Sequence, residues 1–196
     1  MAQYFDELQD NPLERKKLVE EILNSEVWES KEAKAKRPQL QGSQGAGQCY
    51  VTFGAFQHGG VVGVTNAAME FIEVAAKAAK LVQDFPGKVF TSVVLTKNAV
   101  MPLHRDIFNL KGSFNLVCPL KVGKGSAIWQ EMKFGDEFCG NFEFREVDGK
   151  EVPGQKMSVE KPVKVIPQAL EDVKVAAMVV ECEDGEVFSV GVASGS

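Results

Sequence analysis

Apolar residues recur three and four positions apart between residues 12 and 34, which is the spacing of one helical face. They are Leu18, Val19, Ile22, Leu23 and Val27. Asn11, Pro12 and Glu14 form a helix start, because an Asn side chain caps free N–H groups and Pro fits the first turn. The pattern predicts a helix over residues 12–34. Its apolar face packs either on the chain's own sheet or on a partner.

A second helical pattern follows Thr65 and Asn66, either of which can cap its first turn. Its apolar positions, which run up to a Pro-Gly stop, are Ala68, Phe71, Ile72, Ala75, Ala79 and Val82. Glu73 and Lys77 lie one turn apart on the opposite face and predict an ion pair. The pattern predicts a single helix after residue 65.

A glycine-rich segment, residues 57–63, separates this helix from an apolar strand predicted at 49–56. Closely spaced glycines favour backbone angles that other residues avoid, so the segment predicts a tight strand-to-helix turn. An anion site at the helix N-terminus is the alternative, although the spacing matches neither of the common phosphate-binding motifs.

After Gly87 the pattern changes to short apolar segments that tight turns separate, which is typical of strands. The predicted strands are residues 89–97, 114–120, 127–132, 141–146, 157–160, 163–166, 173–181 and 187–192. Predicted turns include Asp148-Gly149 and Pro153-Gly154. Many short strands joined in this way favour a sandwich or a barrel. Trp129 and most of the 13 phenylalanines are expected to fill that barrel.

Residues 38–48 are rich in Gly and Gln and have no apolar period, which is typical of a linker. The predicted organisation is therefore an N-terminal helical arm at 1–37, a linker at 38–48 and a main domain at 49–196. The predicted fold class is α+β: a β-barrel with flanking helices, preceded by the arm.

Composition narrows the classes of function. The 196 residues carry a net charge of −5, which argues against nucleic-acid binding, since that requires clustered Lys and Arg. No apolar run is long enough to span a membrane, and the acidic first residues do not form a secretion signal. Four cysteines without a CxxC pair predict reduced, mostly buried thiols and an intracellular, reducing compartment. A processed plastid protein would have the same features.

The strand-like segment that ends near residue 106 carries the candidate chemistry. His104 and Asp106 are two positions apart, and side chains two positions apart on a strand point the same way. An imidazole and a carboxylate on one face are two of the three ligands in the facial triad of non-haem Fe(II) oxygenases. The alternative is a hydrogen-bonded pair that closes a strand end.

The surrounding sequence resembles a family. The matching segments are Phe53-Gly-Ala-Phe-x-His58-Gly-Gly-x-x-Gly63-Val-Thr65, then Phe90-Thr-Ser-x-x-Leu-Thr-Lys-Asn-x-x-Met-Pro-Leu-His104-Arg-Asp106-x-x-Asn109-x-Lys-Gly-Ser-x-Asn115-Leu-Val, and Ile128-Trp129-Gln-Glu131. They resemble predicted proteins abundant in dinoflagellate algae, many associated with retroelements. Their second half is similar to the double-stranded β-helix (jelly-roll) barrel of Fe(II)/2-oxoglutarate dioxygenases. The resemblance covers about residues 50–195 and implies that His104 and Asp106 match two iron ligands.

The same family has a distal His as third iron ligand and an Arg or Lys that pairs with 2-oxoglutarate. This chain has two histidines, His58 and His104, and neither is at the distal position. Glu171 or Asp172 stands there, and Glu186 or Val187 stands at the Arg position. A carboxylate adds negative charge beside the cofactor dianion. Loss of the Arg removes a charge-assisted contact worth about 2–5 kcal/mol.

The predicted metal site is therefore a vestigial set of His104, Asp106 and Glu171, with Asp172 as the alternative to Glu171. His58 swinging in as third ligand is a further possibility. The predicted function is a pseudoenzyme: a degenerate dioxygenase-like domain that is a non-catalytic binding or structural subunit of a protein assembly. Such a domain would bind no cofactor, and its protein partner could dock through the N-terminal helix. The alternatives are an active oxygenase using Fe(II), or Mn(II), and 2-oxoglutarate with a carboxylate as third ligand, and a metal-free small-molecule binder.

Overall fold

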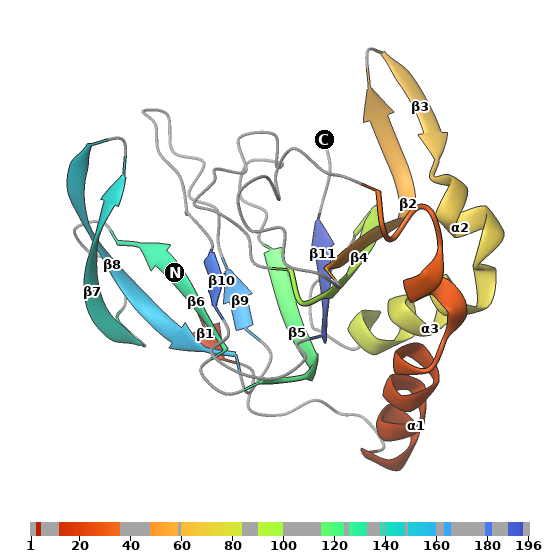
Figure 1. Ribbon diagram of the computed structural model, residues 1–196, viewed down its shortest axis with the longest axis horizontal. Coiled ribbons are helices and arrows are strands. Elements are labelled where there is room, and N and C mark those ends of the chain that lie inside the picture. The colour runs from red at the N-terminus through yellow and green to blue at the C-terminus, as the bar shows by residue number, and fades with distance from the viewer. Residues whose placement is uncertain are drawn as a thin grey trace.

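The computed structural model contains helices and two antiparallel sheets, so the predicted α+β class is confirmed (Figure 1). The structure describes residues 3–4, 12–35, 48–58, 60–83, 90–99, 115–123, 126–132, 138, 140–147, 149–159, 163–165, 179–181 and 188–193. No helix in these ranges is long and apolar enough to cross a membrane.

The larger sheet has seven strands in the order β1-β9-β5-β11-β4-β2-β3. Their bounds, in chain order, are β1 Gln3–Tyr4, β2 Cys49–His58, β3 Val61–Val64, β4 Ser92–Lys97, β5 Asn115–Lys121, β9 Val163–Val165 and β11 Phe188–Ala193. The smaller sheet has the order β10-β6-β8-β7. Its strands are β6 Ala127–Glu131, β7 Asn141–Val147, β8 Lys150–Ser158 and β10 Val179–Glu181. Every neighbouring pair is antiparallel.

The chain changes sheets repeatedly in its second half. It goes from β5 in the larger sheet to β6, β7 and β8 in the smaller one, and then alternates through β9, β10 and β11. The last strand, β11, lies between β4 and β5 and is antiparallel to both. Two strands that are each antiparallel to β11 run parallel to one another, so the end of β4 and the start of β5 lie at opposite ends of the sheet.

The helices are α1 Pro12–Leu23, the 3₁₀ turn η1 Glu26–Glu29, α2 Asn66–Glu70 and α3 Ile72–Gln83. The first helix ends eleven positions before the predicted residue 34. Two side chains explain its end: the Ser25 hydroxyl and the Trp28 indole N–H both donate to the carbonyl of Ile22. They satisfy a carbonyl that the helix leaves free and turn Trp28 into the core. The second predicted helix is two helices, because the chain breaks at Phe71.

The main hydrophobic core lies where α1, η1 and α3 pack on the larger sheet. Its fully buried members include Ile22, Val27, Val51, Leu81, Val82, Leu95 and Leu116. Arg15 on α1 donates to the carbonyl of Leu81, and Glu14 pairs with Lys80 across the helix–helix contact. The apolar face of α1 is therefore packed on the chain's own core. The division into arm, linker and domain stays a prediction, since residues 36–47 lie outside the described ranges.

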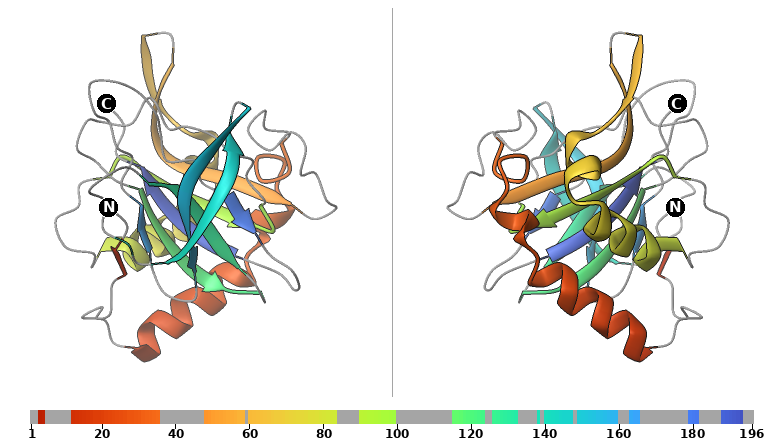
Figure 2. Two further views of the ribbon diagram at one scale, coloured as in Figure 1. Left: turned by 90° about the vertical axis from the view of Figure 1, so that its left-hand side faces the viewer. Right: turned by 90° about the vertical axis from the view of Figure 1, so that its right-hand side faces the viewer.

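The glycine-rich segment contains a second strand, β3, which forms a hairpin with β2. The sequence pattern had predicted a tight turn there and not a strand. β2 pairs with β3 from Ala55 to His58, and Gly60 turns between them with a φ of +81°. The predicted cap is confirmed: the Thr65 hydroxyl accepts a hydrogen bond from the N–H of Ala68 at 3.4 Å. Both views of Figure 2 have the hairpin standing clear of the rest of the molecule.

The predicted Asp148-Gly149 turn joins β7 to β8, but the predicted Pro153-Gly154 turn is wrong. Both residues lie inside β8. Pro153 accepts a hydrogen bond from Met132 N–H, and Gly154 is needed for space: a Cβ there would lie 2.2 Å from the Trp129 ring. This glycine allows a close side-chain packing and does not mark a turn.

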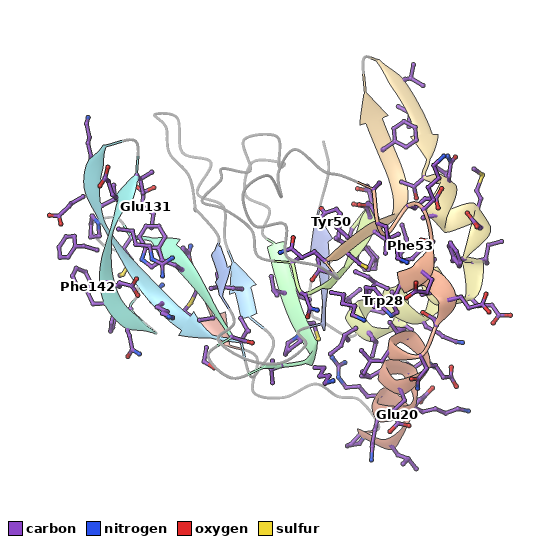
Figure 3. All side chains as sticks on the ribbon, in the orientation of Figure 1. Glu20, Trp28, Tyr50, Phe53, Glu131 and Phe142 are labelled. Carbon is purple, nitrogen blue, oxygen red and sulfur yellow. The ribbon has the colours of Figure 1, made fainter. Side chains whose placement is uncertain are left out.

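The expectation for the aromatic residues is only partly correct. Trp129 and Phe53 are buried. Four other phenylalanines, Phe56, Phe138, Phe142 and Phe144, are between 43% and 56% exposed. Figure 3 labels Phe142 at the outer margin of the smaller sheet and Trp28 and Phe53 within the opposite half.

Candidate functional site

The residues of the predicted metal site, His104, Asp106, Glu171 and the alternative Asp172, lie outside the described ranges. The structure describes the strands from which their segments depart. Lys97 at the end of β4 is opposite Phe188, and Leu116 near the start of β5 is opposite Val192. The segment that carries His104 and Asp106 therefore leaves beside one end of β11 and returns beside the other, about 16 Å away.

The segment with Glu171 and Asp172 leads into β10. In the described part of the chain β10 pairs with β6, and it is the last strand at that side of the smaller sheet. Its other edge has no described neighbour. The connection that carries Glu171 and Asp172 starts from β9 in the larger sheet, where Val165 lies opposite Asn115. Both predicted halves of the site therefore belong to connections that adjoin the same end of β5, and one of them continues to β10 in the smaller sheet.

His58 is the last residue of β2, opposite Val61 at the tip of the β2–β3 hairpin. In the strand order β4 lies between β2 and β11, so His58 lies toward the outer side of the larger sheet. Within the described ranges no group of three or more His, Cys, Asp or Glu residues is placed to hold a metal ion.

The smaller sheet buries polar side chains that the sequence reading missed. Gln130 on β6 and Gln155 on β8 face each other across the sheet, and each is at most 3% exposed. The side-chain oxygen of Gln155 accepts a hydrogen bond from Gly140 N–H at 3.2 Å. The sequence offered one signal for this burial: in a strand, Gln130 lies on the same face as the apolar Ile128. These amides can donate and accept hydrogen bonds, but they do not supply acid–base chemistry.

The opposite face of the same sheet is organised around Trp129. Its indole N–H donates to the carbonyl of Glu143 at 3.2 Å, and its ring covers Gly154. The Arg145 guanidinium lies 5.4 Å from the ring centroid and pairs with Glu143 at 2.8 Å. These contacts fasten β7 to β6 across β8, so the cluster is structural.

Two buried cysteines, Cys49 and Cys118, are not in a disulfide, as predicted. The Cys49 thiol donates to the carbonyl of Trp28 at 3.4 Å, and burial raises the pKa of this thiol. Arg15 donates to the sulfur of Cys118 at 2.7 Å. A thiol that is held protonated and buried is a poor nucleophile, so Cys49 is a core residue. Cys139 and Cys182 lie outside the described ranges.

An open depression of about 590 Å³ lies between α1 and α3. Its charged groups pair with one another: Lys77 contacts Glu21 at 3.0 Å and Glu73 at 4.0 Å. The pairing of Glu73 with Lys77 is the predicted one. The hydrogen bond from Lys77 holds the pKa of the Glu21 carboxyl below its usual value. Mutual pairing on an open surface leaves little charge to attract a ligand.

Exposed apolar side chains gather on the β2–β3 hairpin, on α2 and at the start of α3, and we call this group the hairpin surface. Its members, between 43% and 71% exposed, are Phe56, Val61, Val62, Val64, Met69 and Ile72. Along β3, Val61 points to one face of the hairpin and Val62 and Val64 point to the other, so the hairpin exposes apolar side chains on both faces. Exposed apolar side chains in such number are typical of a protein-binding site.

No family model matches the sequence, and no curated protein is similar to it. The chain is similar to a solved structure, a prolyl-4-hydroxylase from Pseudomonas putida. The identity is 12%, the alignment covers 100% of this chain and 92% of the hydroxylase, and the TM-score is 0.39. A likeness at that level does not establish a shared fold or activity.

Proposed function

We propose that this chain is a dioxygenase-like double-stranded β-helix domain with a degenerate iron centre, acting as a non-catalytic binding or structural subunit of a protein assembly. One observation carries the proposal. The chain has two histidines, and the one outside the HxD segment belongs to the β2–β3 hairpin, toward the outer side of the larger sheet. His58 is therefore not placed to supply the second imidazole that the iron centre of such a domain requires.

The strand arrangement supports the jelly-roll part of the proposal. Jelly rolls are two antiparallel sheets between which the chain alternates in Greek-key connections. Here β9, β10 and β11 alternate between the sheets, and β11 inserts between β4 and β5. The connection that carries His104 and Asp106 joins opposite ends of the larger sheet, and β10 offers an edge without a described neighbour. A strand at that edge would bring His104 and Asp106 toward the segment of Glu171.

The donor set does not fit the cofactor. His104, Asp106 and Glu171 would supply one imidazole and two carboxylates, a set that suits Fe(II) or Mn(II) as such. It would cancel the positive charge that a bound dianion of 2-oxoglutarate requires. Glu186 or Val187 at the expected cofactor position offers no cation to compensate. We therefore derive no catalytic step through this site.

The binding role is supported by the hairpin surface. Val61, Val62 and Val64 form an edge strand without a charged residue or a proline, the features that usually protect an edge. We propose that an extended apolar segment of another protein pairs with β3. The expected docking through the N-terminal helix is less well supported, because α1 buries its apolar face in its own core. The free, buried thiols of Cys49 and Cys118 support a reducing intracellular compartment.

An anaerobic titration of the metal-stripped protein with Fe(II), followed by 2-oxoglutarate, tests the proposal. We expect no visible charge-transfer band of a chelated cofactor and no turnover of 2-oxoglutarate. A band that is present in the parent protein and lost in His104→Ala would overturn the proposal. It would favour the active oxygenase, and Glu171→Ala and Asp172→Ala would then identify the third ligand.

A further inference from the structure

β7 (Asn141–Val147) is the outermost strand of the smaller sheet. Over its whole length it pairs with β8, from Asn141 opposite Lys156 to Val147 opposite Lys150. Its other edge has no neighbour among the described strands. The strand carries no Pro and no Lys, the residues that most often protect an exposed edge.

The hydrogen bond of Pro153 shows which backbone groups of β7 point toward that edge. The carbonyl of Pro153 accepts from Met132 N–H, so it points toward β6 and away from β7. Phe144 is opposite Pro153. Because hydrogen-bonded and non-bonded pairs alternate along an antiparallel ladder, the N–H and C=O of Phe144 point away from β8. The same holds for Phe142 and Glu146, two positions to either side.

The side chains of this edge form an exposed aromatic cluster. Phe142 and Phe144 are 56% and 55% exposed and share one face of the sheet. Their ring centroids lie 5.0 Å apart in an edge-to-face arrangement, and Phe138 lies 6.5 Å from Phe142. Figure 3 has Phe142 pointing away from the rest of the molecule. Glu143 and Arg145 lie on the opposite face, where they pair at 2.8 Å.

We propose that this edge is a homodimer interface, in which β7 of two copies pair antiparallel about a twofold axis at Phe144. Phe144 would then lie opposite Phe144 of the second copy, with both aromatic clusters on the same face. The outward backbone groups of Phe142, Phe144 and Glu146 would bond to Glu146, Phe144 and Phe142 of the second copy. The two smaller sheets would become one continuous sheet.

The charges on the strand select this register and a second copy as occupant. With the axis at Phe144, Glu143 lies opposite Arg145 of the second copy, and Arg145 lies opposite its Glu143. Moving the axis by one residue places Glu143 opposite Glu143, or Arg145 opposite Arg145, and like charges directly opposite destabilise a sheet. A strand that is complementary to itself in one register fits a twofold, isologous contact.

Sedimentation of the full chain at rising concentration tests the proposal. We expect a monomer–dimer equilibrium whose dissociation constant rises at least about tenfold in Phe144→Asp, which places two carboxylates on the axis. Val62→Asp, at an apolar position of the hairpin surface that is 71% exposed, is the matched control and should leave the dimer intact. A parent protein that stays monomeric near 100 μM, which is on the order of the dissociation constant of a weak interface, would overturn the proposal. So would a dimer insensitive to Phe144→Asp.

A charge exchange between positions 143 and 145 distinguishes association in this register from non-specific association. Glu143→Arg and Arg145→Glu each place like charges opposite one another, so each variant alone should associate less than the parent. Mixed together, the two variants restore opposite charges at both positions and should form a heterodimer. A mixture that does not associate would refute the register. Since Arg145 also covers Trp129, far-UV circular dichroism of each variant checks that the sheet is intact.

Discussion

The larger sheet and the smaller sheet are stabilised in different ways. The larger one is covered by α1 and α3 over a continuous core, to which fifteen buried residues contribute within the described ranges. The smaller one buries apolar residues of β6 and β8, among them Ile128, Trp129 and Met157, together with the polar side chains of Gln130 and Gln155. Burial of apolar area dominates the first, while the second combines apolar burial with buried polar side chains and the specific contacts of the Trp129 ring. The difference predicts where substitutions are tolerated.

Leu95→Ala should be the largest disruption. Leu95 is fully buried in the central part of the core, and a Leu-to-Ala cavity costs about 2–5 kcal/mol of the free energy of unfolding. Urea unfolding followed by far-UV circular dichroism measures the loss. Val147→Ala, in the smaller sheet, is the comparison and should cost about 1 kcal/mol. Equal losses at the two positions would contradict the contrast.

Gly154→Ala should disturb the smaller sheet selectively. The new methyl group would lie 2.2 Å from the Trp129 ring, and overpacking of this kind costs about 1–3 kcal/mol. We expect a shifted tryptophan fluorescence spectrum together with the loss of stability. The control is Gly149→Ala, where φ is +74° but a methyl group meets no atom within 4 Å. It should cost about 1 kcal/mol without changing the spectrum. An unchanged spectrum in Gly154→Ala would refute the account.

Arg145→Met should have a smaller effect of about 0.5–1 kcal/mol. The substitution keeps an apolar chain over the indole but removes the cation from the ring and the ion pair with Glu143. Thermal unfolding of the variant and of Lys150→Met, an exposed lysine of the same hairpin, measures the difference. Identical midpoints for the two variants would mean that the guanidinium contributes nothing.

Glu21→Gln should have the smallest effect, and that effect should depend on pH. The folded-state pKa of Glu21 is lowered, chiefly by the hydrogen bond from Lys77. A lowered pKa stabilises the folded state above the unfolded pKa and ceases to do so as pH falls through the folded pKa. The variant should therefore be slightly less stable at pH 7 and equal to the parent at acid pH. Because the pair is exposed, 1 M NaCl should also remove the difference.

The sequence predicted most of the elements whose structure is determined by residues close together in the chain. The cap at Thr65, the Asp148-Gly149 hairpin and the helical face of Ile22 and Leu23 follow from nearest neighbours alone. Prediction from the sequence failed where the structure depends on a residue distant in the chain. The end of α1 depends on Trp28 reaching back to Ile22, and Gly154 is explained by a ring on a strand that comes 25 positions earlier.

Prediction of the site was limited in another way. The HxD pattern and the lack of a distal His can be read from the chain, and both concern residues outside the described ranges. The exposed aromatic edge of β7 was not predicted. Alternation marks Phe142 and Phe144 as one face, but that face is buried only if another strand or helix covers it. A single sequence carries no signal for a missing cover.

The position of β11 has a consequence for how the protein is made. This strand occupies the centre of the larger sheet, although its residues, Phe188–Ala193, come last of all the strands. During synthesis β4 and β5 must wait without their shared neighbour until Ala193 has left the ribosome. Folding of this sheet is therefore a late, non-local step, and such steps are slow. A ribosome stalled before residue 188 would display two unpaired strand edges, which are substrates for chaperones.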